Sequence, residues 1–432
     1  MFVYRRGMVM WNLSVSIEKN GKQVRVGSIC GSVTEDAVFS YDEEYLSDKT
    51  AVPISVSLPL QTDVFSPAQT KCFFEGLLPE GFTRRAVAQR LRADADDYLA
   101  ILSKLGNECI GAIRITDQTD TLDIPSYEPV RDSDLYTLSH EDAAEATHFL
   151  TGTRLSLAGA SGKVGLYYDI ATKQWFLPKG TAPSTHIVKQ SHVRLQSIVT
   201  NEQLCMLTAS RLGIKVPDSF IVDVDHDGDR NLLFATRRFD RVFADDAVSL
   251  NGLNVPRRLH QEDFAQALGI SSGNKYERPG EEHMKKMFSL IRDVSENPIE
   301  DQLALWDMLV FDYLIGNTDC HVKNFSLLYS SNINAPRLAP AYDIVSTRIY
   351  ESCSKEMAFA IGGESDIERI TRDSFEAAAS EVGIGRRLAM QRFDSMSDRF
   401  EKELTAAAGE LQSLGFKRST EICERILRHS CI

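Results

Sequence analysis

Apolar residues follow two different periods along the chain, and the change between them indicates how the chain is organised. Near the start, apolar and polar residues alternate in "MVMWNLSVSI" and "VRVGSICG", with the turn-forming "EKNGK" between them. Alternation of this kind is typical of half-buried β-strands. The stretch "GFTRRAVAQRLRADADDYLAILSKLG" has helical spacing, and "CIGAIRI" again has a strand pattern. We therefore predict a compact first domain, residues 1–115, that begins with strands.

A polar segment separates this domain from a second region that is rich in strands. Residues 116–140 contain many Asp, Pro, Ser and Thr residues, which predicts a linker or an edge loop. Five strand patterns follow before residue 245, and one helical pattern, "IVTNEQLCMLTASRLG", comes after the third of them. The five strand patterns are "LSLAGASGKVGLYYD", "QWFLPKG", "THIVKQ", "SFIVDV" and "NLLFATRRFD".

Helical patterns dominate the last part of the chain. In the clearest of them, "IEDQLALWDMLVFDYLIG", apolar residues recur on one face of the predicted helix, at Ile299, Leu303, Trp306, Val310, Tyr313 and Leu314. We predict an α+β fold with two lobes: a β-rich lobe in residues 116–245, which follows the extra domain, and an all-α lobe in residues 246–432. The cleft between two such lobes is the first place to look for a ligand.

Composition and charge limit the class of protein. The chain has 432 residues, enough for two or three domains, and its 48 Lys and Arg against 61 Asp and Glu give a net charge of −13. An acidic chain should not bind nucleic acid strongly on its own. The cysteines form no C-x-x-C pair, and no signal peptide or membrane-spanning run is evident, so a reduced cytoplasmic protein is expected.

Two motifs imitate known ligand sites and fail on inspection. "DVDHDGD" resembles the start of a calcium-binding EF-hand loop, but its twelfth position is Phe234 where a glutamate is required, so we predict a hairpin turn at Asp227-Gly228. "LAGASGKV" lacks the first glycine and the final Ser or Thr of a Walker A loop. A loop of small residues remains, and it can bring backbone N–H groups close to phosphate oxygens. Its members are Ala158, Gly159, Ala160, Ser161 and Gly162.

The stretch "GNTDCHVKNFS" carries the strongest chemical signal. Asn324 is the fifth residue after Asp319, the interval of the protein-kinase pattern D-x-x-x-x-N, and "DCHVKN" also resembles the D-x-H-x-x-N loop of lipid-type kinases. A kinase needs a phosphate cradle, a lysine, a catalytic Asp, an Asn and a metal-binding Asp, in this order. The small-residue loop, Lys189, Asp319, Asn324 and Asp343 follow that order. A strand pair at "FSLLYS" and "PRLAPAYD" would bring Asp343 back beside Asn324.

Each of these residues also has an ordinary structural explanation. Lys189 alone is compatible with a solvated strand lysine, Asp319 and Asp343 with helix caps or turn residues, and Asn324 with a turn. His321 is expected to orient the loop or to support its structure, because no second histidine lies near it that would complete a metal site. The joint order of the four residues favours a kinase site.

At this point the chain resembles a known family, the HipA family of bacterial serine/threonine kinases. The resemblance covers nearly the whole chain, and we predict from it a two-lobed protein-kinase-like fold with an extra N-terminal domain. The matching stretches are "FFEGLLPEG", "SLAGASGK", "THIVK", "NEQLCMLTASRLGIKVPD", "RRFDR", "RLHQEDFAQALG", "KYE", "IGNTDCHVKNFS" and "PAYDIVS".

The resemblance implies an ATP- and Mg²⁺-dependent toxin of a type II toxin–antitoxin system. It assigns Lys189 and Lys163 with the small-residue loop to ATP, Asp319 to catalysis, Asn324 and Asp343 to Mg²⁺, and Ser156 to autophosphorylation. It also implies a HipB-like helix-turn-helix antitoxin that binds operator DNA, and an aminoacyl-tRNA synthetase as the class of protein substrate. Such a toxin would inhibit translation and growth.

Two departures and two alternatives stay open. Ser161-Gly162 replaces the more usual Gln-Glu or Gln-Pro pair of the loop, and Arg237 stands where an acidic residue is common near the hinge between the lobes. One alternative is a catalytically silent scaffold that only stabilises an antitoxin on DNA, although a scaffold has no need for all four kinase residues. The other is a small-molecule kinase, against which the extra N-terminal domain argues because a small substrate needs no large docking surface.

Overall fold

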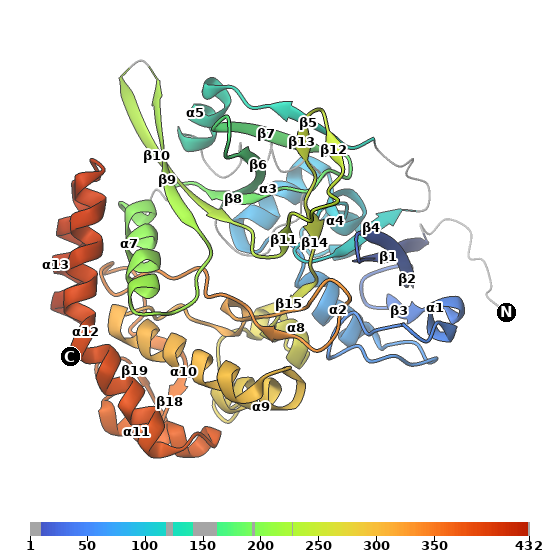
Figure 1. Cartoon of the computed structure of the whole chain (residues 1–432). Helices are drawn as coiled ribbons and strands as arrows, with labels where there is room; N and C mark the ends of the chain where they lie inside the picture. Colours follow the sequence, from blue (N-terminus) through green and yellow to red (C-terminus); the bar gives the residue numbers. More distant parts are fainter. Residues whose placement is uncertain (1–9, 118–123, 141–161, 192–194, 227, 431–432) are drawn as a thin grey trace.

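The computed structural model describes residues 10–117, 124–140, 162–191, 195–226 and 228–430. Figure 1 shows the N-terminal domain (blue) beside a β-rich lobe, with the helices of the C-terminal lobe (orange to red) packed below and along one side. This arrangement of elements is the two-lobed α+β fold predicted from the sequence. Within the described ranges, no helix is both long enough and apolar enough to span a membrane.

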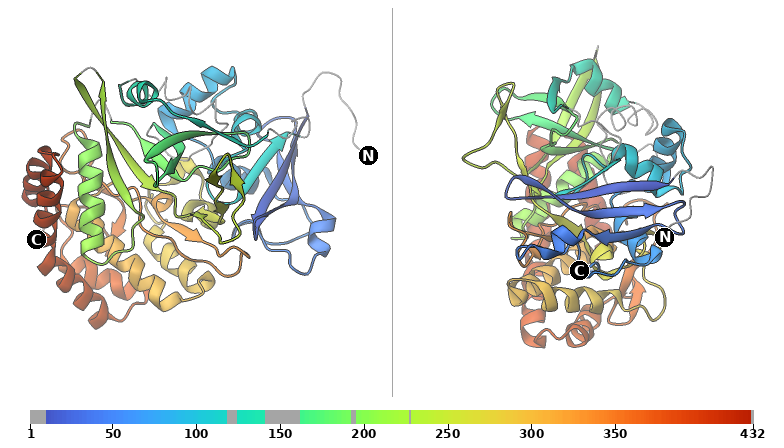
Figure 2. Two further views of the ribbon diagram at one scale, coloured as in Figure 1. Left: turned by 45° about the horizontal axis from the view of Figure 1, so that its top comes forward. Right: turned by 90° about the vertical axis from the view of Figure 1, so that its right-hand side faces the viewer.

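The N-terminal domain is built on a four-stranded antiparallel sheet in the order β3-β2-β1-β4, which lies in front in the right panel of Figure 2. Asn20 and Gly21 both adopt positive φ angles, of 51° and 74°, in the predicted hairpin between the first two strands. The strands are β1 (Trp11–Lys19), β2 (Lys22–Gly31), β3 (Val38–Tyr41) and β4 (Ile113–Asp117). The helices are α1 (Glu43–Ser47), α2 (Pro67–Glu75), α3 (Gly81–Leu91) and α4 (Tyr98–Leu105).

The long helical pattern of this domain divides into two helices, α3 and α4. Arg92 ends α3 in the left-handed conformation, and the side chain of Asp97 accepts a hydrogen bond from the N–H of Ala100 and so caps α4. A new N-cap starts a new helix because it satisfies N–H groups that the previous turn does not reach.

The second lobe contains a six-stranded antiparallel sheet in the order β5-β7-β6-β8-β10-β9. Four of the five predicted strands are confirmed, as is the predicted helix, which is α7 (Ile198–Arg211). The remaining pattern, "LSLAGASGKVGLYYD", is confirmed as a strand from Lys163 onward, and its residues 155–161 lie outside the described residues. The strands are β5 (Ser126–Pro129), β6 (Lys163–Asp169), β7 (Gln174–Lys179), β8 (His186–Lys189), β9 (Ser219–His226) and β10 (Asp229–Arg237). β9 and β10 form the hairpin expected at Gly228, whose φ is 85°.

The interpretation of residues 116–140 as a linker or edge loop was wrong for most of the described part. Residues 126–129 form the edge strand β5, and Asp132–His140 form the helix α5. Pro129 cannot donate a hydrogen bond, which an edge strand tolerates, and buried Tyr127, Leu135 and Leu138 anchor the segment. The polar composition hid these few apolar contacts.

The C-terminal lobe is mainly helical, with α8 (Phe264–Leu268), α9 (His283–Val294), α10 (Pro298–Ile315), α11 (Arg372–Val382), α12 (Arg386–Ser413) and α13 (Arg418–His429). It also contains short strands that the prediction of an all-α lobe did not include. They are β12 (Ser249–Leu250), β13 (Leu253–Asn254), β14 (Arg257–Arg258), β15 (Gln261–Asp263), β16 (Ser326–Leu328), β17 (Arg337–Leu338), β18 (Glu356–Ile361) and β19 (Glu364–Asp366). β14 pairs with β11 (Arg241–Val242), which ends the second lobe. The β16-β17 pair is the strand pair expected before Asp343.

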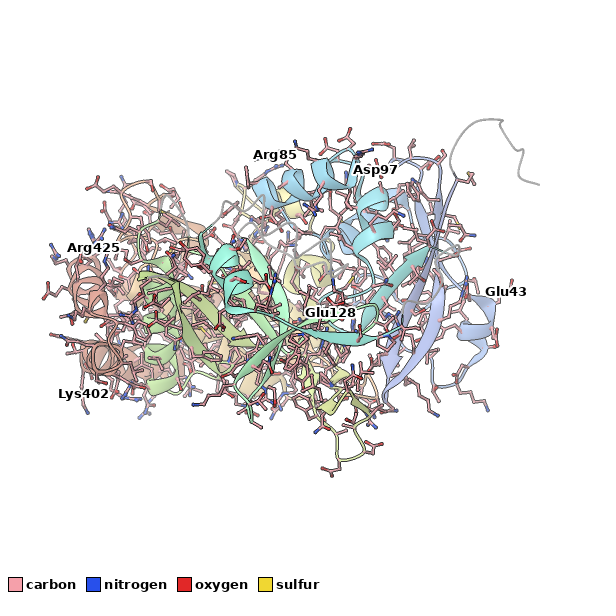
Figure 3. All side chains as sticks on the ribbon, turned by 90° about the horizontal axis from the view of Figure 1, so that it is seen from above. Glu43, Arg85, Asp97, Glu128, Lys402 and Arg425 are labelled. Carbon is pink, nitrogen blue, oxygen red and sulfur yellow. The ribbon has the colours of Figure 1, made fainter. Side chains whose placement is uncertain are left out.

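A buried ionic cluster joins the N-terminal domain to the other two regions. Glu108 of the N-terminal domain contacts Arg238, Arg241 and Arg258 at 3.2, 2.9 and 2.5 Å, and the side chains of all four are at most 6% exposed. Glu18 of β1 adds a second carboxylate, 3.2 Å from Arg258. Figure 3 shows other charged side chains, such as Arg85 and Lys402, at the outer edge of the molecule, where both are exposed. The N-terminal domain thus contacts both lobes through buried ion pairs.

Candidate active site

The stretch "GNTDCHVKNFS" begins where the buried helix α10 ends. Gly316 ends this helix with φ 70°, and a Cβ atom there would lie 2.8 Å from Cγ of Arg348, so the turn requires glycine. The chain reverses at this glycine and passes through a short 3₁₀ turn, Val322–Asn324, into β16. The helix end therefore fixes where the following loop lies; we call residues 317–324 the catalytic loop.

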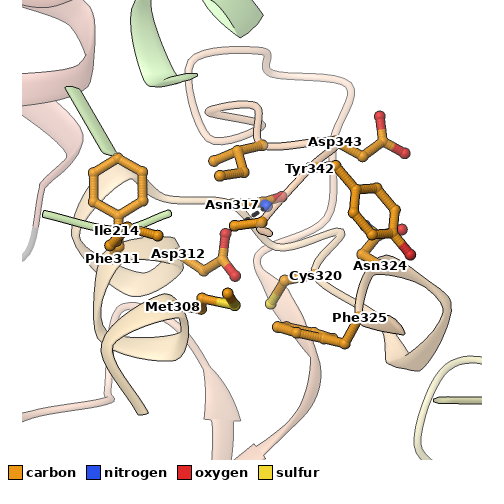
Figure 4. A pocket seen from close by; sticks show the side chains of 12 residues that line it. Ile214, Met308, Phe311, Asp312, Asn317, Cys320, Asn324, Phe325, Tyr342 and Asp343 are labelled. Atoms are coloured by element: carbon orange, nitrogen blue, oxygen red, sulfur yellow. Dashed lines mark hydrogen bonds between the residues drawn. The ribbon is translucent and has the colours of Figure 1, made fainter. Parts of the chain in front are cut away.

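The catalytic loop is held by hydrogen bonds to α10 and within itself. Nδ2 of Asn317 donates to Oδ1 of Asp312 at 2.8 Å, and the N–H of Asp319 donates to Oδ1 of Asn317 at 3.2 Å. Nδ2 of Asn324 donates to the carbonyl oxygen of Asp319 at 2.9 Å. Figure 4 shows Asp312 and Asn317 joined beneath the loop, beside a small cavity that Asn324 and Asp343 also line. These bonds satisfy groups that a loop would otherwise leave to water.

Asp319 lies at the surface of the loop with its side chain accessible from solvent. Its Oδ1 accepts a hydrogen bond from the hydroxyl of Tyr276 at 2.5 Å, and no donor to Oδ2 exists among the described residues. The surrounding protein raises the pKa of Asp319 by desolvation, and the Tyr276 bond opposes this change. One carboxylate oxygen is thus held while the other is available to an incoming hydroxyl group.

Asp343 connects the two lobes through Lys189. Nζ of Lys189, on β8, lies 2.6 Å from Oδ1 of Asp343 and 2.5 Å from Oε1 of Glu202 on α7. Asp343 has a positive φ of 60°, an uncommon conformation for a residue other than glycine, of the kind that occurs at functional sites. The Lys–Glu pair corresponds to the ion pair between strand and helix that active protein kinases require.

The opposite charges of Lys189, Glu202 and Asp343 favour the ionised forms of Lys189 and Asp343. Burial alone would lower the pKa of Lys189, but the carboxylates of Asp343 and Glu202 outweigh it and raise the pKa. Lys189 and Lys163 together hold the pKa of Asp343 well below its usual range, against the effect of burial. Burial lowers the pKa of Lys163, which forms no ion pair with any residue that the structure describes. The carboxylate of Asp343 opposes this effect of burial on Lys163.

The donors present suit Mg²⁺ bound with a nucleotide. Mg²⁺ prefers carboxylate and amide oxygens and commonly uses one or two protein ligands together with phosphate oxygens. The amide nitrogen of Asn324 is occupied by Asp319, so its oxygen remains as an acceptor. The side chain of Asp343 is 37% exposed, and in Figure 4 its carboxylate points away from the small cavity. Asn324 and Asp343 would hold the ion.

His321 is buried beside the cluster and is neutral at physiological pH. Burial, with smaller effects from nearby charges, lowers the pKa of His321 to about 3. Its ring lies edge-on to the ring of Tyr276, with centroids 5.3 Å apart, and its Nδ1 has no hydrogen-bond partner in the described part of the chain. This environment agrees with the orienting or structural part expected for His321, which stays a prediction.

Several predicted residues cannot be placed. Ser156 and the loop residues Ala158, Gly159, Ala160 and Ser161 lie outside the described residues. Gly162 is described, and its carbonyl oxygen accepts a hydrogen bond from the N–H of Gln190, next to Lys189, at 3.2 Å. Lys163 directly faces Lys189 across the β6-β8 ladder. The described chain thus enters β6 at the lysine pair.

Arg237, the departure near the hinge, is exposed. Its guanidinium lies 3.6 Å from Asp218, whose side chain is 85% exposed. Its neighbour Arg238, by contrast, is buried and forms ion pairs with Glu108 and Asp240. The consequence of Arg237 for nucleotide contacts stays open.

Sequence reasoning missed four residues of this cluster: Glu202, Tyr276, Glu80 and Asp312. Glu202 could have been found, because it is the one carboxylate in the first helical pattern after the lysine strand. Glu80 lies in the N-terminal domain, 3.1 Å from Lys323 and 2.9 Å from Lys275. Burial alone would raise its pKa, but these two lysines lower the pKa of Glu80 to about 2. No local pattern reveals such a contact between domains.

Comparison with known proteins decides the family. A model of the HipA-like C-terminal domain matches residues 155–404, and a model of the HipA N-terminal domain matches residues 20–116. The chain belongs to the HipA family of serine/threonine kinases. The family resemblance stated from the sequence is thereby confirmed, and so is the α+β fold class.

Relatives extend the similarity over nearly the full chain. "Putative kinase Y4mE" of Sinorhizobium fredii is 33% identical over 86% of this chain and 88% of its own length. The "Serine/threonine-protein kinase toxin HipA" of Shewanella oneidensis is 26% identical over 90% of this chain and 89% of its own. The solved structure of Shewanella oneidensis HipA with HipB and its operator DNA has a TM-score of 0.77 at 24% identity, and covers 96% of this chain and 97% of that one. The HipA fold is therefore shared.

Proposed function

We propose that this HipA-family chain transfers the γ-phosphate of ATP to a serine or threonine of a protein and acts as the toxin of a toxin–antitoxin pair. The observation that carries the proposal is the continuous set of contacts Glu202–Lys189–Asp343, at 2.5 and 2.6 Å, beside the exposed carboxylate of Asp319. Phosphoryl transfer depends mainly on positioning and on charge stabilisation, which such a cluster supplies.

Each residue has a defined part in the proposed reaction. Oδ2 of Asp319 accepts the proton of the acceptor hydroxyl while the oxygen of that hydroxyl attacks the γ-phosphorus of ATP. Lys189, fixed by Glu202, and Lys163 bind phosphate oxygens, while Asn324 and Asp343 hold Mg²⁺. When bound, Mg²⁺ neutralises charge on the phosphates. The backbone N–H groups of the small-residue loop, residues 158–162, would cradle the phosphates.

The partners follow from the relatives. The Shewanella oneidensis structure contains HipA, HipB and operator DNA, so we propose a HipB-like helix-turn-helix antitoxin for this chain. The net charge of −13 favours DNA contact mainly through the antitoxin. We propose a protein substrate of the aminoacyl-tRNA synthetase class, whose phosphorylation would inhibit translation and growth.

We also propose control by autophosphorylation at Ser156. A phosphate there adds roughly −1.5 to −2 charge at neutral pH, which would repel ATP and draw lysines such as Lys163 and Lys189 away from it. The purified chain incubated with Mg²⁺ and ATP should then gain phosphate on Ser156 and lose ATP affinity, while Asp319→Ala stays unmodified. Peptide mass spectrometry with calorimetry checks this; a modified Ser156 with undiminished ATP binding would overturn it.

Phosphoproteomics after brief induction tests the proposed function. Cells that express the parent chain should gain phosphoserine or phosphothreonine on a small set of proteins, and cells that express Asp319→Ala should not. Equal phosphoproteomes would favour the silent scaffold, which binds antitoxin without chemistry. A phosphorylated metabolite without any phosphoprotein would favour the small-molecule kinase. The four kinase residues argue for the first outcome.

A further inference from the structure

The N-terminal domain reaches the catalytic loop at Lys323, through the buried carboxylate of Glu80 and, at 3.5 Å, the carbonyl oxygen of Gly76. Glu80 stands immediately before α3, and its side chain is 13% exposed. Oε1 of Glu80 lies 3.1 Å from Nζ of Lys323, which belongs to the catalytic loop. Oε2 lies 2.9 Å from Nζ of Lys275, which belongs to a different segment of the C-terminal lobe. One carboxylate of the N-terminal domain thus joins two segments of another domain.

Both of these segments lead to Asp319. Lys323 is the fourth residue after Asp319, its side chain is 4% exposed, and its ammonium group forms ion pairs with Glu80 and Asp263. The same ammonium group lies farther from the carbonyl oxygen of Gly76, at 3.5 Å, and from the hydroxyl of Ser272, at 3.4 Å. Lys275 precedes Tyr276, whose hydroxyl donates to Oδ1 of Asp319 at 2.5 Å. The ammonium of Lys275 also lies 5.4 Å from the centre of the Tyr276 ring, within the range of a cation–π contact. Glu80 therefore fixes the loop and the hydroxyl that holds its carboxylate.

A carboxylate on an exposed loop can rotate about its side-chain bonds unless a neighbour holds it. Tyr276 binds Oδ1 alone, and within the described residues Oδ2 has no donor. The bond therefore restricts rotation of the carboxylate and leaves Oδ2 as the oxygen that can accept from an acceptor hydroxyl. Small errors in such an orientation reduce the rate of transfer strongly without preventing nucleotide binding.

We propose that Tyr276 is a positioning residue for the catalytic carboxylate and that Glu80 of the N-terminal domain keeps Tyr276 and the catalytic loop in register, so that this domain completes the active site. The inference rests on the proposed kinase function for its effect on rate. Its structural part, the ordering of the loop by Glu80, is independent of any activity.

The first experiment compares Tyr276→Phe with Tyr45→Phe. Each change removes one hydroxyl and keeps the ring; Tyr45, in the N-terminal domain, donates to the carbonyl of Val52 far from the catalytic loop. With γ-³²P-ATP and dephosphorylated casein as acceptor, Tyr276→Phe should lower kcat roughly 10- to 100-fold and leave KM for ATP within about twofold. Tyr45→Phe should behave as the parent. An unchanged or higher kcat for Tyr276→Phe would overturn the proposal, and a higher one would mark its hydroxyl as a blocking group.

The second experiment compares Glu80→Gln with Glu75→Gln by hydrogen–deuterium exchange without nucleotide. Glu75 is a matched control, because its carboxylate is equally buried at 14% exposure and pairs with Arg84 at 2.8 Å inside the same domain. Glu80→Gln should speed exchange at residues 316–326, and Glu75→Gln should not. Equal exchange in the two variants would overturn the proposal even if the chain proves to be an active kinase.

Coupling of the two residues gives the last check. If Glu80 acts through Tyr276, the losses of kcat should not multiply. The double variant Glu80→Gln/Tyr276→Phe should then have a kcat within about twofold of the less active single variant. Multiplied losses would show independent effects and contradict the chain of contacts. A parent chain without any transfer would refute the kinase function, while the exchange experiment would still decide the ordering of the loop.

Discussion

Asp319 is the residue on which the proposed chemistry depends. We predict that Asp319→Ala reduces phosphoryl transfer by at least about 100-fold, because a general base contributes this much or more to such a reaction. ATP affinity and folding should change little, since the side chain is exposed and accepts one side-chain hydrogen bond, from Tyr276. Initial rates, calorimetric ATP titration and thermal unfolding measure the three properties. Transfer at the parent rate would exclude Asp319 as the base.

Asn324 and Asp343 should act on the metal rather than on the proton. We predict that Asn324→Ala and Asp343→Ala weaken the dependence of ATP binding on Mg²⁺, because each removes one hard oxygen ligand. Calorimetric titrations of ATP at several Mg²⁺ concentrations measure this dependence. Unchanged affinities would show that neither residue binds the metal. Asp343→Ala should have the larger effect, because it also removes the ion pair between Asp343 and Lys189.

The sequence predicted the residues with kinase spacing better than the residues that support them. Lys189 and Asp343 are in direct contact, and Asn324 and Asp319 share a hydrogen bond, while the kinase roles assigned to them from their order in the chain stay predictions. Tyr276 could not be recognised, because a tyrosine in a loop is ordinary until its hydroxyl is seen 2.5 Å from Asp319. Supporting residues depend on three-dimensional proximity rather than on spacing.

Among the elements, α10 carries an unusual buried charge. Burial raises the pKa of Asp312 to about 7, and Nδ2 of Asn317 supplies its one side-chain hydrogen bond. The pKa of this carboxyl group is higher in the folded state than in the unfolded state, where it is about 4. Its contribution to the free energy of unfolding is therefore complete below about pH 4 and is lost as the pH rises through the folded pKa. The parent should therefore lose stability between about pH 4 and pH 7.

We predict that Asp312→Asn removes most of this dependence. The amide keeps an oxygen for Asn317 and carries no charge, so the variant should exceed the parent by roughly 1–3 kcal/mol at pH 8 and match it more closely at pH 5. Urea unfolding at both values measures the difference. A parent and variant with parallel pH profiles would show that Asp312 does not titrate in this range.

Elements with strong periodicity were predictable, and elements with polar composition were not. The pattern of α10 predicted its extent well, although Ile299 at its start is 74% exposed rather than buried. The edge strand β5 and helix α5 were taken as linker, because a few anchoring apolar residues do not outweigh a polar composition. Short strands of the C-terminal lobe likewise depend on partners distant in sequence.

At the scale of the whole molecule, the ionic cluster around Glu108 holds the domains together. We predict that Glu108→Ala destabilises the fold by about 3–5 kcal/mol, because it leaves Arg238, Arg241 and Arg258 buried without their shared carboxylate. Asp394→Ala, which breaks the exposed pair with Arg372, should cost less than about 1 kcal/mol. Denaturant unfolding compares the two, and equal effects would contradict the structural role of the cluster.

The most direct test of the account is phosphate transfer by the purified chain with Mg²⁺ and γ-³²P-ATP, followed by phosphoamino-acid analysis of the labelled protein. The account predicts phosphoserine or phosphothreonine with the parent chain, none without Mg²⁺, and at least about a 100-fold lower rate with Asp319→Ala. Label that appears equally with Asp319→Ala, or a parent that binds ATP and Mg²⁺ but transfers no phosphate to any protein, would contradict it.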